Sequence, residues 1–497
     1  MHLFNHLRSL LRFTRTLKGS IALGMISVLL VMGIAMGKAT AQKPGVPISK
    51  TAAAQIQALV QEKRSRTPIQ QKINSSILYT LKARRGDALI RSVSALNTFV
   101  RVDSNNNIQV VVKTNVQVTP ALLQNIQATG AKIVSAPLGY DRIVAQVPLA
   151  QVENIASFPE VISIRPFLQP QLHSSTTAGG VDALTVNAPS QTNQVVSNVE
   201  QKRSHITSAL PHMVQQLAQA PTVPITNVGR VTSEGYKAHG ADIASSSYNV
   251  NGTGVKIGVL SDSYNNLGGA ATDIARGDLP AEGVTLVGSG DIKNTSPSFP
   301  GSDEGRAMLQ IIHDLVPGAK LYFATAFNSE ADFANNIREL QKAGCDIIVD
   351  DVYYFAEPVF QDGIVAQAVN EVTAKGALYF SSAGNSGNKN DKTSGVWEGD
   401  FADAGQAPLG IPGNIHRFAS GSSGMYNRLT ANTGTITLQW SDPYGKSAND
   451  YDLYVLNSSG TQVVAASTDG QNGNGDPFEV VNAQSSGDQV IIVKYSG

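Results

Sequence analysis

The chain has 497 residues, too many for one ordinary domain, and its 42% hydrophobic and 15% charged residues are typical of a globular protein. Lys and Arg together number 38, as do Asp and Glu, so the near-zero net charge gives no reason to expect nucleic-acid binding or attraction to an anionic membrane. The single cysteine, Cys345, excludes an intrachain disulfide framework. It opens an apolar run, so we expect a small buried residue, with a reactive thiol as the alternative.

Residues 1–41 have the parts of a secretory signal. Four basic residues within Arg8–Lys18 precede the uncharged stretch Ile21–Gly37, and Ala39–Ala41 is a small-residue cleavage site. The uncharged stretch is slightly short for a membrane span, so a retained anchor is the alternative reading. The signal predicts a secreted, periplasmic or extracellular protein that has no membrane contact after cleavage.

Three regions follow the signal. Residues 42–97, rich in Ala, Gln, Lys and Arg, indicate a leader that is either helical or poorly ordered. Residues 98–168 predict an α+β unit with the order β-α-β-β-α-β, because strand-like runs flank two helices of apolar periodicity. Ser, Thr, Gln and Asn dominate residues 169–235, which we interpret as a linker with one helix near 208–219.

The second half of the chain changes its pattern once. Strands and helices alternate over residues 236–412, which predicts an α/β domain with a parallel sheet covered on both faces. Short alternating strands with turn signals between them predict a β-sandwich over residues 413–497. Ligands and catalytic groups of a parallel sheet collect beyond the carboxyl ends of its strands. Three polar loops lie at such ends: Ser261–Ser263, Asp350–Asp351 and Ser381–Gly387.

Several of these segments resemble subtilisin-like serine peptidases. Gly254–Ser263 looks like the strand that ends in the family's triad aspartate, and Ala383–Gly387 looks like its A-G-N-x-G loop. Gly305–Ala319 resembles the helix and turn that follow the family's H-G-T motif. The matching segments run in the family order over about 150 residues. The resemblance implies a serine-type endopeptidase with a protein or peptide substrate, Asp262 as triad aspartate and Asn385 as donor to the oxyanion. It also makes residues 98–168 a propeptide-like domain and residues 413–497 a pre-peptidase-type sandwich.

The sequence departs from this family at the histidine, where Glu304 begins Glu-Gly-Arg. Helical spacing places Glu304 on the stripe of Met308, Ile311 and Leu315, which predicts an inward side chain, and places His313 on the opposite side. A buried carboxylate needs a partner, and Asp262 is the natural candidate. Two carboxylates held close raise one pKa, so Glu304 is the predicted general base. The sedolisin branch also has a glutamate here, but its helix carries an aspartate where this chain has Met308.

The predicted catalytic residues are therefore Asp262, Glu304 and Asn385, and Asp350 and Asp351 are predicted to line the substrate cleft. Each has a structural alternative: a turn or helix-capping Asp262, a Glu304 favoured by the helix dipole, a turn Asn385, and a solvated or cation-binding aspartate pair.

No G-T-S-x-A motif follows Asn385, so the chain is predicted to be incomplete or inactive as an enzyme unless a serine is supplied beyond residue 497. A non-catalytic protein that binds peptides, proteins or glycans is the second hypothesis, and residues 98–168 as an inhibitor of another peptidase are a third. No cofactor is implied with certainty. Ca²⁺ is a candidate ligand of Asn449, Asp450 and Asp452, and the histidines show no metal-ligand spacing.

Overall fold

The structure is a computed structural model that describes residues 47–172, 229, 231–292, 301–388, 390–391, 393–419 and 422–497. The signal sequence and the helix expected near 208–219 lie outside these residues. Within them, no helix is long and apolar enough to cross a membrane. Four parts follow one another along the chain: a helical segment (47–97), a four-stranded unit (98–172), a parallel-sheet unit (229–402) and a β region (403–497). The protein is thus a mixed α/β structure with one parallel sheet and several antiparallel ones.

The helical segment is ordered, as the helical reading of the leader predicts. Side chains of Ser49, Asn74 and Asp87 accept the first free N–H groups of its three α-helices, and Gly86, at φ 84°, ends the second. The elements are α3 (Lys50–Arg64), η1 (Gln70–Lys72), α4 (Ser75–Arg85) and α5 (Ala88–Arg91).

The four-stranded unit has the predicted order β-α-β-β-α-β. Its antiparallel sheet has the strand order β2-β3-β1-β4. Alternate residues of the central strands, such as Val110 and Ile143, pack against Leu122 and Ile126 of α6. The elements are β1 (Asn107–Thr114), α6 (Pro120–Ala128), β2 (Lys132–Ser135), β3 (Arg142–Pro148), η2 (Leu149–Gln151), α7 (Val152–Ala156), β4 (Val161–Pro166) and β5 (Gln171–Leu172).

The parallel-sheet unit has the strand order β11-β9-β6-β8-β7, and every neighbouring pair is parallel. Its strands are β6 (Lys256–Ser261), β7 (Thr285–Leu286), β8 (Lys320–Thr325), β9 (Ile347–Asp350) and β11 (Leu378–Ser381), and the short β10 (Val352–Tyr353) follows β9 outside this sheet. Its helices are α9 (Gly235–Ala238), α10 (Ala241–Tyr248), α11 (Ala270–Arg276), α12 (Glu304–Leu315), α13 (Glu330–Lys342) and α14 (Ile364–Ala374).

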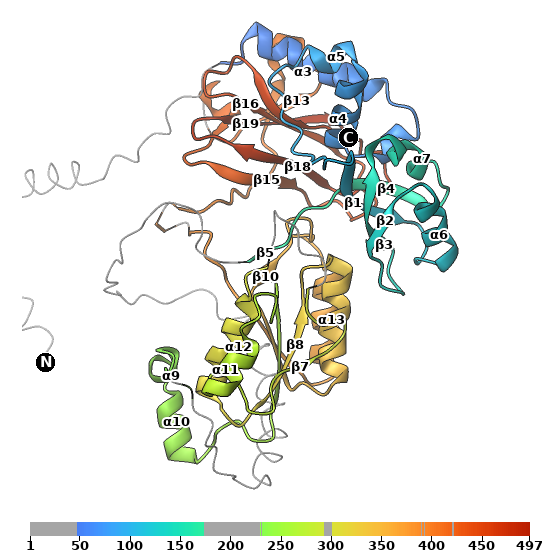
Figure 1. Ribbon diagram of the computed structural model, residues 1–497. Helices are drawn as coiled ribbons and strands as arrows, with labels where there is room; N and C mark the ends of the chain where they lie inside the picture. The colour runs from blue at the N-terminus through green and yellow to red at the C-terminus, as the bar shows by residue number, and fades with distance from the viewer. Residues whose placement is uncertain are drawn as a thin grey trace, which may run out of the picture.

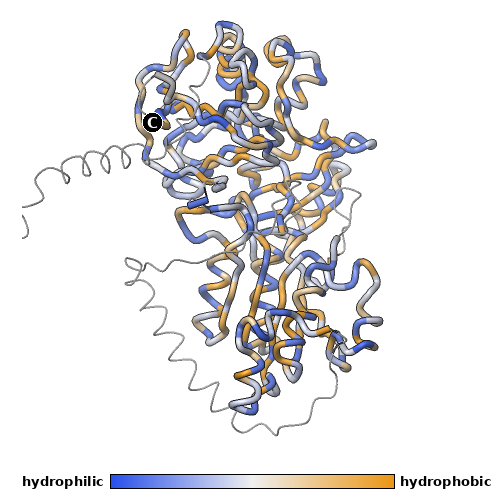
Figure 2. The backbone as a smooth tube through the Cα atoms, turned by 90° about the vertical axis from the view of Figure 1, so that its left-hand side faces the viewer, coloured by the Kyte–Doolittle hydropathy of each residue, from blue (hydrophilic) through white to orange (hydrophobic). Residues whose placement is uncertain are grey.

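The central strands β6, β8 and β9 of the parallel sheet are covered on both faces, as a near-continuous apolar strand pattern requires, whereas the edge strands β7 and β11 are partly exposed. On one face, Leu260 and Ile348 pack with residues of α13 and α14. On the other face, Val259 and Phe323 pack with Leu309 of α12 and with α11. The alternation between the faces follows the period of two along each strand. The two helix layers flank the strands in the lower part of Figure 1, and hydrophobic stretches recur along this part of the tube in Figure 2.

The β region contains two antiparallel sheets. One has the order β12-β13-β19-β16-β17 with β14 also paired to β19, and the other pairs β15 with β18. Residues from both sheets, including Leu453, Ile492 and Val481, share one apolar core. The predicted boundary at residue 413 is wrong, because β12 already belongs to the first sheet. The elements are β12 (Asp403–Gln406), η3 (Pro408–Gly410), β13 (Asn414–His416), η4 (Ser422–Met425), β14 (Asn427–Arg428), β15 (Thr433–Gln439), β16 (Asp450–Leu456), β17 (Val463–Ser467), β18 (Phe478–Gln484) and β19 (Gln489–Ser496).

The helical segment packs on the β region, at the other end of the sequence. Ile56 and Leu59 of α3, each fully buried, share a core with Tyr454 of β16 and Ile491 of β19. Figure 1 shows α3, α4 and α5 beside these strands at the top of the molecule. No local pattern in either segment predicts this long-range contact.

Lys63 forms buried ion pairs where a calcium site was a candidate. Its Nζ lies 2.6 Å from Asp450 and 2.8 Å from Asp452, and all three side chains are at most 7% exposed. Burial lowers the pKa of Lys63, but the charges of Asp452 and Asp450 outweigh it and raise the pKa overall. An ammonium group of the chain itself therefore occupies the space between these carboxylates, and the calcium hypothesis for them is wrong.

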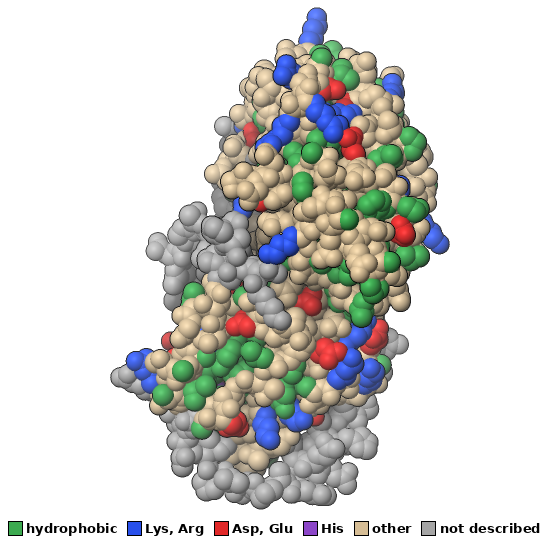
Figure 3. All heavy atoms as spheres, turned by 45° about the vertical axis from the view of Figure 1, so that its right-hand side comes forward, with side chains coloured by type: hydrophobic (Ala, Val, Ile, Leu, Met, Phe, Trp, Pro, Cys, Tyr) green, Lys and Arg blue, Asp and Glu red, His purple; other side chains and the backbone are tan. Residues whose placement is uncertain are grey.

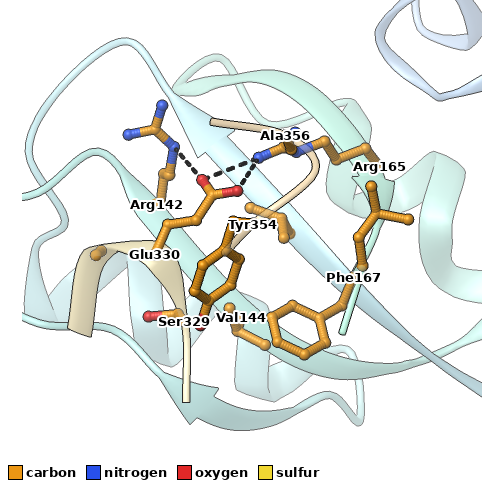
Figure 4. Close-up of a pocket in the computed structure, with 11 residues that line it drawn as sticks. Arg142, Val144, Arg165, Phe167, Ser329, Glu330, Tyr354 and Ala356 are labelled. Atoms are coloured by element: carbon orange, nitrogen blue, oxygen red, sulfur yellow. Dashed lines mark hydrogen bonds and ion pairs between the residues drawn. The ribbon is translucent and has the colours of Figure 1, made fainter. Parts of the chain in front are cut away.

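A second buried ion cluster joins the four-stranded unit to α13. Glu330, in the first turn of α13, lies 3.2 Å from the guanidinium of Arg165 and 3.8 Å from that of Arg142. Figure 4 shows the Glu330 carboxylate between the two guanidinium groups, above the ring of Tyr354. The residues around it enclose a cavity of about 10 Å³, space for about one water molecule. On the outer surface, in contrast, acidic and basic side chains are interspersed over the face shown in Figure 3.

Glu357→Gln is expected to stabilise the protein at pH 8 by about 1–3 kcal/mol. Burial, and then the charge of Glu330, raise the pKa of Glu357 to about 7. Because this folded-state pKa lies above the ordinary value, the free energy of unfolding falls as pH rises from about 4.5 to 7 and the buried carboxyl group ionises. A glutamine oxygen can still accept the N–H of Val365, now 3.1 Å from the carboxylate.

Urea unfolding between pH 4 and 8 measures this effect. The difference in the free energy of unfolding between variant and wild type should increase with pH up to about 7 and then stay constant. Glu371→Gln is the matched control: Glu371 pairs with Arg338 in solvent and its pKa is lowered, so its loss gives no gain at pH 8. A gap of the same size at pH 4 would contradict the assignment to titration of Glu357.

Candidate functional site

The predicted site residues gather at the carboxyl edge of the parallel sheet. In the sheet register Leu260 lies beside Asp350, and Asp350 lies beside Ser381. The ends of β6, β9 and β11 are therefore adjacent, and the loops that follow them start from one edge. Polar side chains can gather here because the strands stop while the helices continue to cover the faces.

Asp262 directly follows β6 and is fully buried. Its carboxylate accepts the N–H groups of Ser302 and Ser263, the Ser302 hydroxyl at 2.8 Å, and the N–H of Glu304 at 3.1 Å. It thus binds the free N–H groups where α12 begins. The predicted pairing with Glu304 is corrected in part: the Asp262 carboxylate accepts the main-chain N–H of Glu304 and contributes to the raised pKa of the Glu304 side chain only through its charge.

Asp303 is a site residue that the sequence reasoning missed. It has φ 55°, is 4% exposed, and its carboxylate accepts from the Ser263 hydroxyl at 2.8 Å and from two loop N–H groups. An ion pair with Arg306 completes its surroundings. An aspartate next to a predicted helix start was the available signal, because this residue type favours the cap position and tolerates a positive φ. Asp303 fixes the loop that precedes Glu304.

Glu304 is the first residue of α12, and its side chain contacts Ser261 and Asp351. The Ser261 hydroxyl donates to its carboxyl group, and a hydrogen bond joins that group to the Asp351 carboxyl. Burial, the contact with Asp351 and the charge of Asp262 together raise the pKa of Glu304 to about 7, although the Ser261 hydrogen bond opposes the shift. With a pKa of about 7, Glu304 can accept or release a proton near neutral pH.

The predicted buried face of α12 is wrong in part. Gly305, Leu309 and His313 form the buried face, whereas Ile311 is 50% exposed. Gly305 lies so close to Phe323 of β8 that a Cβ there would come within 2.4 Å of the ring. This close approach, which a periodicity count cannot weigh, sets the rotation of the helix. Glu304 still reaches the site because it is the first residue of α12 and precedes the residues that pack against the sheet.

Asp350 and Asp351 have different environments. Asp350 is 3% exposed, and its carboxylate accepts from the hydroxyls of Tyr379 at 2.5 Å and Ser381 at 2.8 Å. Burial raises the pKa of Asp350. Since its oxygens are held inside the sheet edge, the geometry argues against a direct contact with substrate. Asp351 is partly exposed and faces Glu304, so of the two aspartates it is the better candidate for contact with substrate.

Asn385 lies in the exposed loop that follows β11. The loop begins beside the Asp350–Asp351 turn, since Ser382 N–H donates to the Asp350 carbonyl at 3.2 Å. Asn385 therefore belongs to the same edge of the sheet as Glu304. Its predicted role toward an oxyanion stays a prediction. Within the residues that the structure describes, no group of three or more His, Cys, Asp or Glu side chains is arranged to hold a metal ion.

An extended segment of the chain itself lies beside this site. β5 pairs antiparallel with β10, with Leu172 opposite Val352 and Gln171 opposite Tyr353. β10 begins one residue after Asp351, so the paired segment borders the carboxyl pair. Leu172 packs against the core of the parallel-sheet unit. Figure 1 shows β5 and β10 side by side between the upper and lower parts of the molecule.

No family profile and no curated protein matches this sequence. One solved structure that resembles the chain is fervidolysin from Fervidobacterium pennivorans, described as a keratinolytic enzyme related to subtilisin. The identity is 13% and the TM-score 0.27, and the match covers 77% of this chain and 53% of that one. The chain thus spans about half the length of that protein. So distant a likeness carries no argument, and the residues of the site have to support any function.

Proposed function

We propose that this chain is a secreted protein of the serine-endopeptidase type, which binds an extended peptide along β10 and uses Glu304 as the proton acceptor. One observation carries the proposal: β5 is added to β10 as an antiparallel strand beside the Glu304–Asp351 pair. Adding a strand to a free sheet edge is a general way to bind an extended peptide. A substrate is expected to take the place of β5.

The chemistry follows from the pair of carboxyl groups. Ionised Glu304 accepts the proton of an attacking hydroxyl, and the same proton is later delivered to the leaving amine. Asp351 positions Glu304 and holds its pKa near neutrality. Asn385, in the adjacent exposed loop, is the proposed donor to the oxyanion. The hydroxyl that attacks is expected to come from a serine outside the described residues.

Non-catalytic peptide binding is the second candidate, and the position of Ser261 favours it. Ser261 is fully buried and donates to Glu304, so it positions that carboxyl group and does not meet a substrate. Peptide binding along β10 requires no nucleophile. The same site therefore supports either function, and activity decides between them.

Casein hydrolysis by the purified full chain between pH 3 and 9, with Glu304→Gln beside it, separates the two candidates. Hydrolysis that disappears in the variant supports the peptidase. No hydrolysis at any pH, together with retained binding of a peptide, supports the binding protein. Hydrolysis that persists in Glu304→Gln would sink the proposed role of Glu304.

Leu172→Asp is expected to free β10 for an added peptide. A charge at this partly buried position destabilises β5 on β10, so an added peptide competes with a weakened strand. We expect affinity for a labelled peptide with the sequence of residues 166–172 to rise about tenfold or more, measured by fluorescence anisotropy. Gln171→Ala is the control, because within the described residues that side chain bonds to nearby carbonyls of its own segment. Equal affinities in both variants would contradict binding at β10.

A further inference from the structure

We propose that Gln439, the last residue of β15, is a positioning residue of the peptide site. Its side chain holds the turn that directly follows β10, which we call the β10 turn (Tyr354–Glu357). The β region would thereby fix one end of the strand along which the peptide is proposed to bind. The statement that Gln439 holds the β10 turn stands by itself. The statement that this contact strengthens peptide binding rests on the proposed function.

The β10 turn presents three successive main-chain carbonyls that need donors from elsewhere. Glu357 N–H donates to the Tyr354 carbonyl at 3.2 Å, and this bond closes the turn. The carbonyls of Phe355, Ala356 and Glu357 follow the Tyr354 carbonyl along the chain. These residues are buried or half-buried, and main-chain carbonyls in such surroundings are costly to leave without a hydrogen bond.

Gln439 binds the turn through both ends of its side-chain amide. The amide nitrogen donates to the carbonyls of Phe355 at 3.1 Å and Glu357 at 3.3 Å. The amide oxygen accepts the N–H of Val359 at 3.2 Å. A glutamine can make these contacts together because its amide group carries two donors and an acceptor. One side chain of the β region thus joins main-chain groups on both sides of Ala356.

Other residues of the β region reinforce this contact. The Tyr444 hydroxyl donates to the Ala356 carbonyl at 3.1 Å, so each of the three carbonyls has a donor in the β region. The Ala356 side chain is 2% exposed and packs with Phe478 and Val480 of β18. The β10 turn is therefore held on the β region by hydrogen bonds and by a small apolar core.

β10 needs such support because it is short and lies outside the parallel sheet. Its strand partner within the described residues is β5. A peptide in the place of β5 binds more tightly if β10 is already extended, since ordering a strand at the moment of binding costs affinity. Val352 and Tyr354 fix one side of the segment by packing in the core of the parallel-sheet unit. Figure 1 shows β10 between the parallel sheet below and β15 above, where Gln439 fixes the main chain beyond Tyr354.

Phe355 connects the held turn to the strand itself. Its ring meets the ring of Tyr353 edge-on, with the centroids 5.2 Å apart. Tyr353 lies opposite Gln171 in the β5–β10 pairing, so the ring pair belongs to the strand along which the peptide is proposed to bind. Because Gln439 holds the Phe355 carbonyl, loss of this contact is expected to loosen the ring pair and β10 together.

The experiment compares two glutamine variants of the full chain, each combined with Leu172→Asp to free β10. Gln439→Met keeps the length of the side chain and removes its hydrogen bonds. Gln55→Met is the matched control, because Gln55 also holds a main-chain group, the Val463 N–H at 2.8 Å, on another strand of the β region. We expect Gln439→Met to weaken binding of the labelled 166–172 peptide about tenfold, and the control to change it by less than about twofold.

Hydrogen exchange in the same proteins measures the turn directly. Amides of residues 352–359 are expected to exchange faster in Gln439→Met than in the Leu172→Asp parent, and at the parental rate in Gln55→Met. Tyr444→Phe removes the hydroxyl that binds the Ala356 carbonyl and keeps the ring. It is expected to change exchange and affinity in the same directions as Gln439→Met, by smaller amounts.

The two measurements separate the two statements. Exchange at the parental rate in Gln439→Met would overturn the statement that Gln439 holds the β10 turn. Faster exchange with unchanged peptide affinity, or equal losses of affinity in Gln439→Met and Gln55→Met, would overturn its role in the peptide site. A parent that binds no peptide would contradict the proposed function, and exchange would still decide whether Gln439 holds the turn.

Discussion

Glu304→Gln is expected to lower the rate of peptide hydrolysis by a factor of about 10²–10⁴, the usual contribution of a general base. Glutamine keeps the size of the side chain and can still accept from the Ser261 hydroxyl. The fold should therefore persist while the proton acceptor is lost. Rates with a fluorogenic peptide under single-turnover conditions measure the effect, and Glu282→Gln, an exposed residue of another loop, is the control.

The pH profile tests the same assignment without loss of the base. Glu304 acts when ionised, and its pKa is about 7, so the rate should rise with pH through about 7. Ser261→Ala removes a hydrogen bond that favours the ionised form, which moves the rise to higher pH. Asp351→Asn removes a neighbouring carboxyl group that favours the protonated form, which moves the rise to lower pH. Shifts in the same direction, or none, would contradict the Ser261–Glu304–Asp351 arrangement.

Lys63→Met is expected to cost about 3–5 kcal/mol of stability at pH 7, the largest loss we predict from one substitution. The change removes the ammonium group while Asp450 and Asp452 stay buried. Burial raises the pKa of Asp450 to about 6, so this carboxyl group takes up a proton as pH falls, and the loss should shrink toward pH 4. Chemical denaturation followed by tryptophan fluorescence measures it, since Trp440 lies in the β region.

Two further variants bound this prediction. Lys342→Met breaks a solvent-exposed pair with Glu339, in which the lysine side chain is 64% exposed, and should cost less than about 1 kcal/mol. Lys63→Met combined with Asp450→Asn and Asp452→Asn removes the buried charges together and should recover part of the stability. If Lys63→Met and Lys342→Met lowered the free energy of unfolding equally little, the contact between the helical segment and the β region would not depend on its buried ions.

The site was predictable as far as it depends on strand ends. A run such as Lys256–Leu260 is apolar enough to be a buried strand, and the residues that follow it must emerge at one edge of a parallel sheet. Glu304 was found because it begins an amphipathic helix in the right place along the chain. Its partner was not predictable, since the choice between Asp262 and Asp351 depends on which carboxylate caps α12.

The sequence by itself determined the local elements: the order β-α-β-β-α-β, the parallel sheet with helices on both faces and the antiparallel strands after it. These follow from periodicity, turn residues and helix caps, which act over a few residues. Only the tertiary structure decided that α3 covers β16 and β19, that Lys63 occupies the space between Asp450 and Asp452, and that β5 lies on β10. Such contacts join residues far apart in the sequence, and they are selected by the complementarity of whole buried faces and by the need to pair every buried charge.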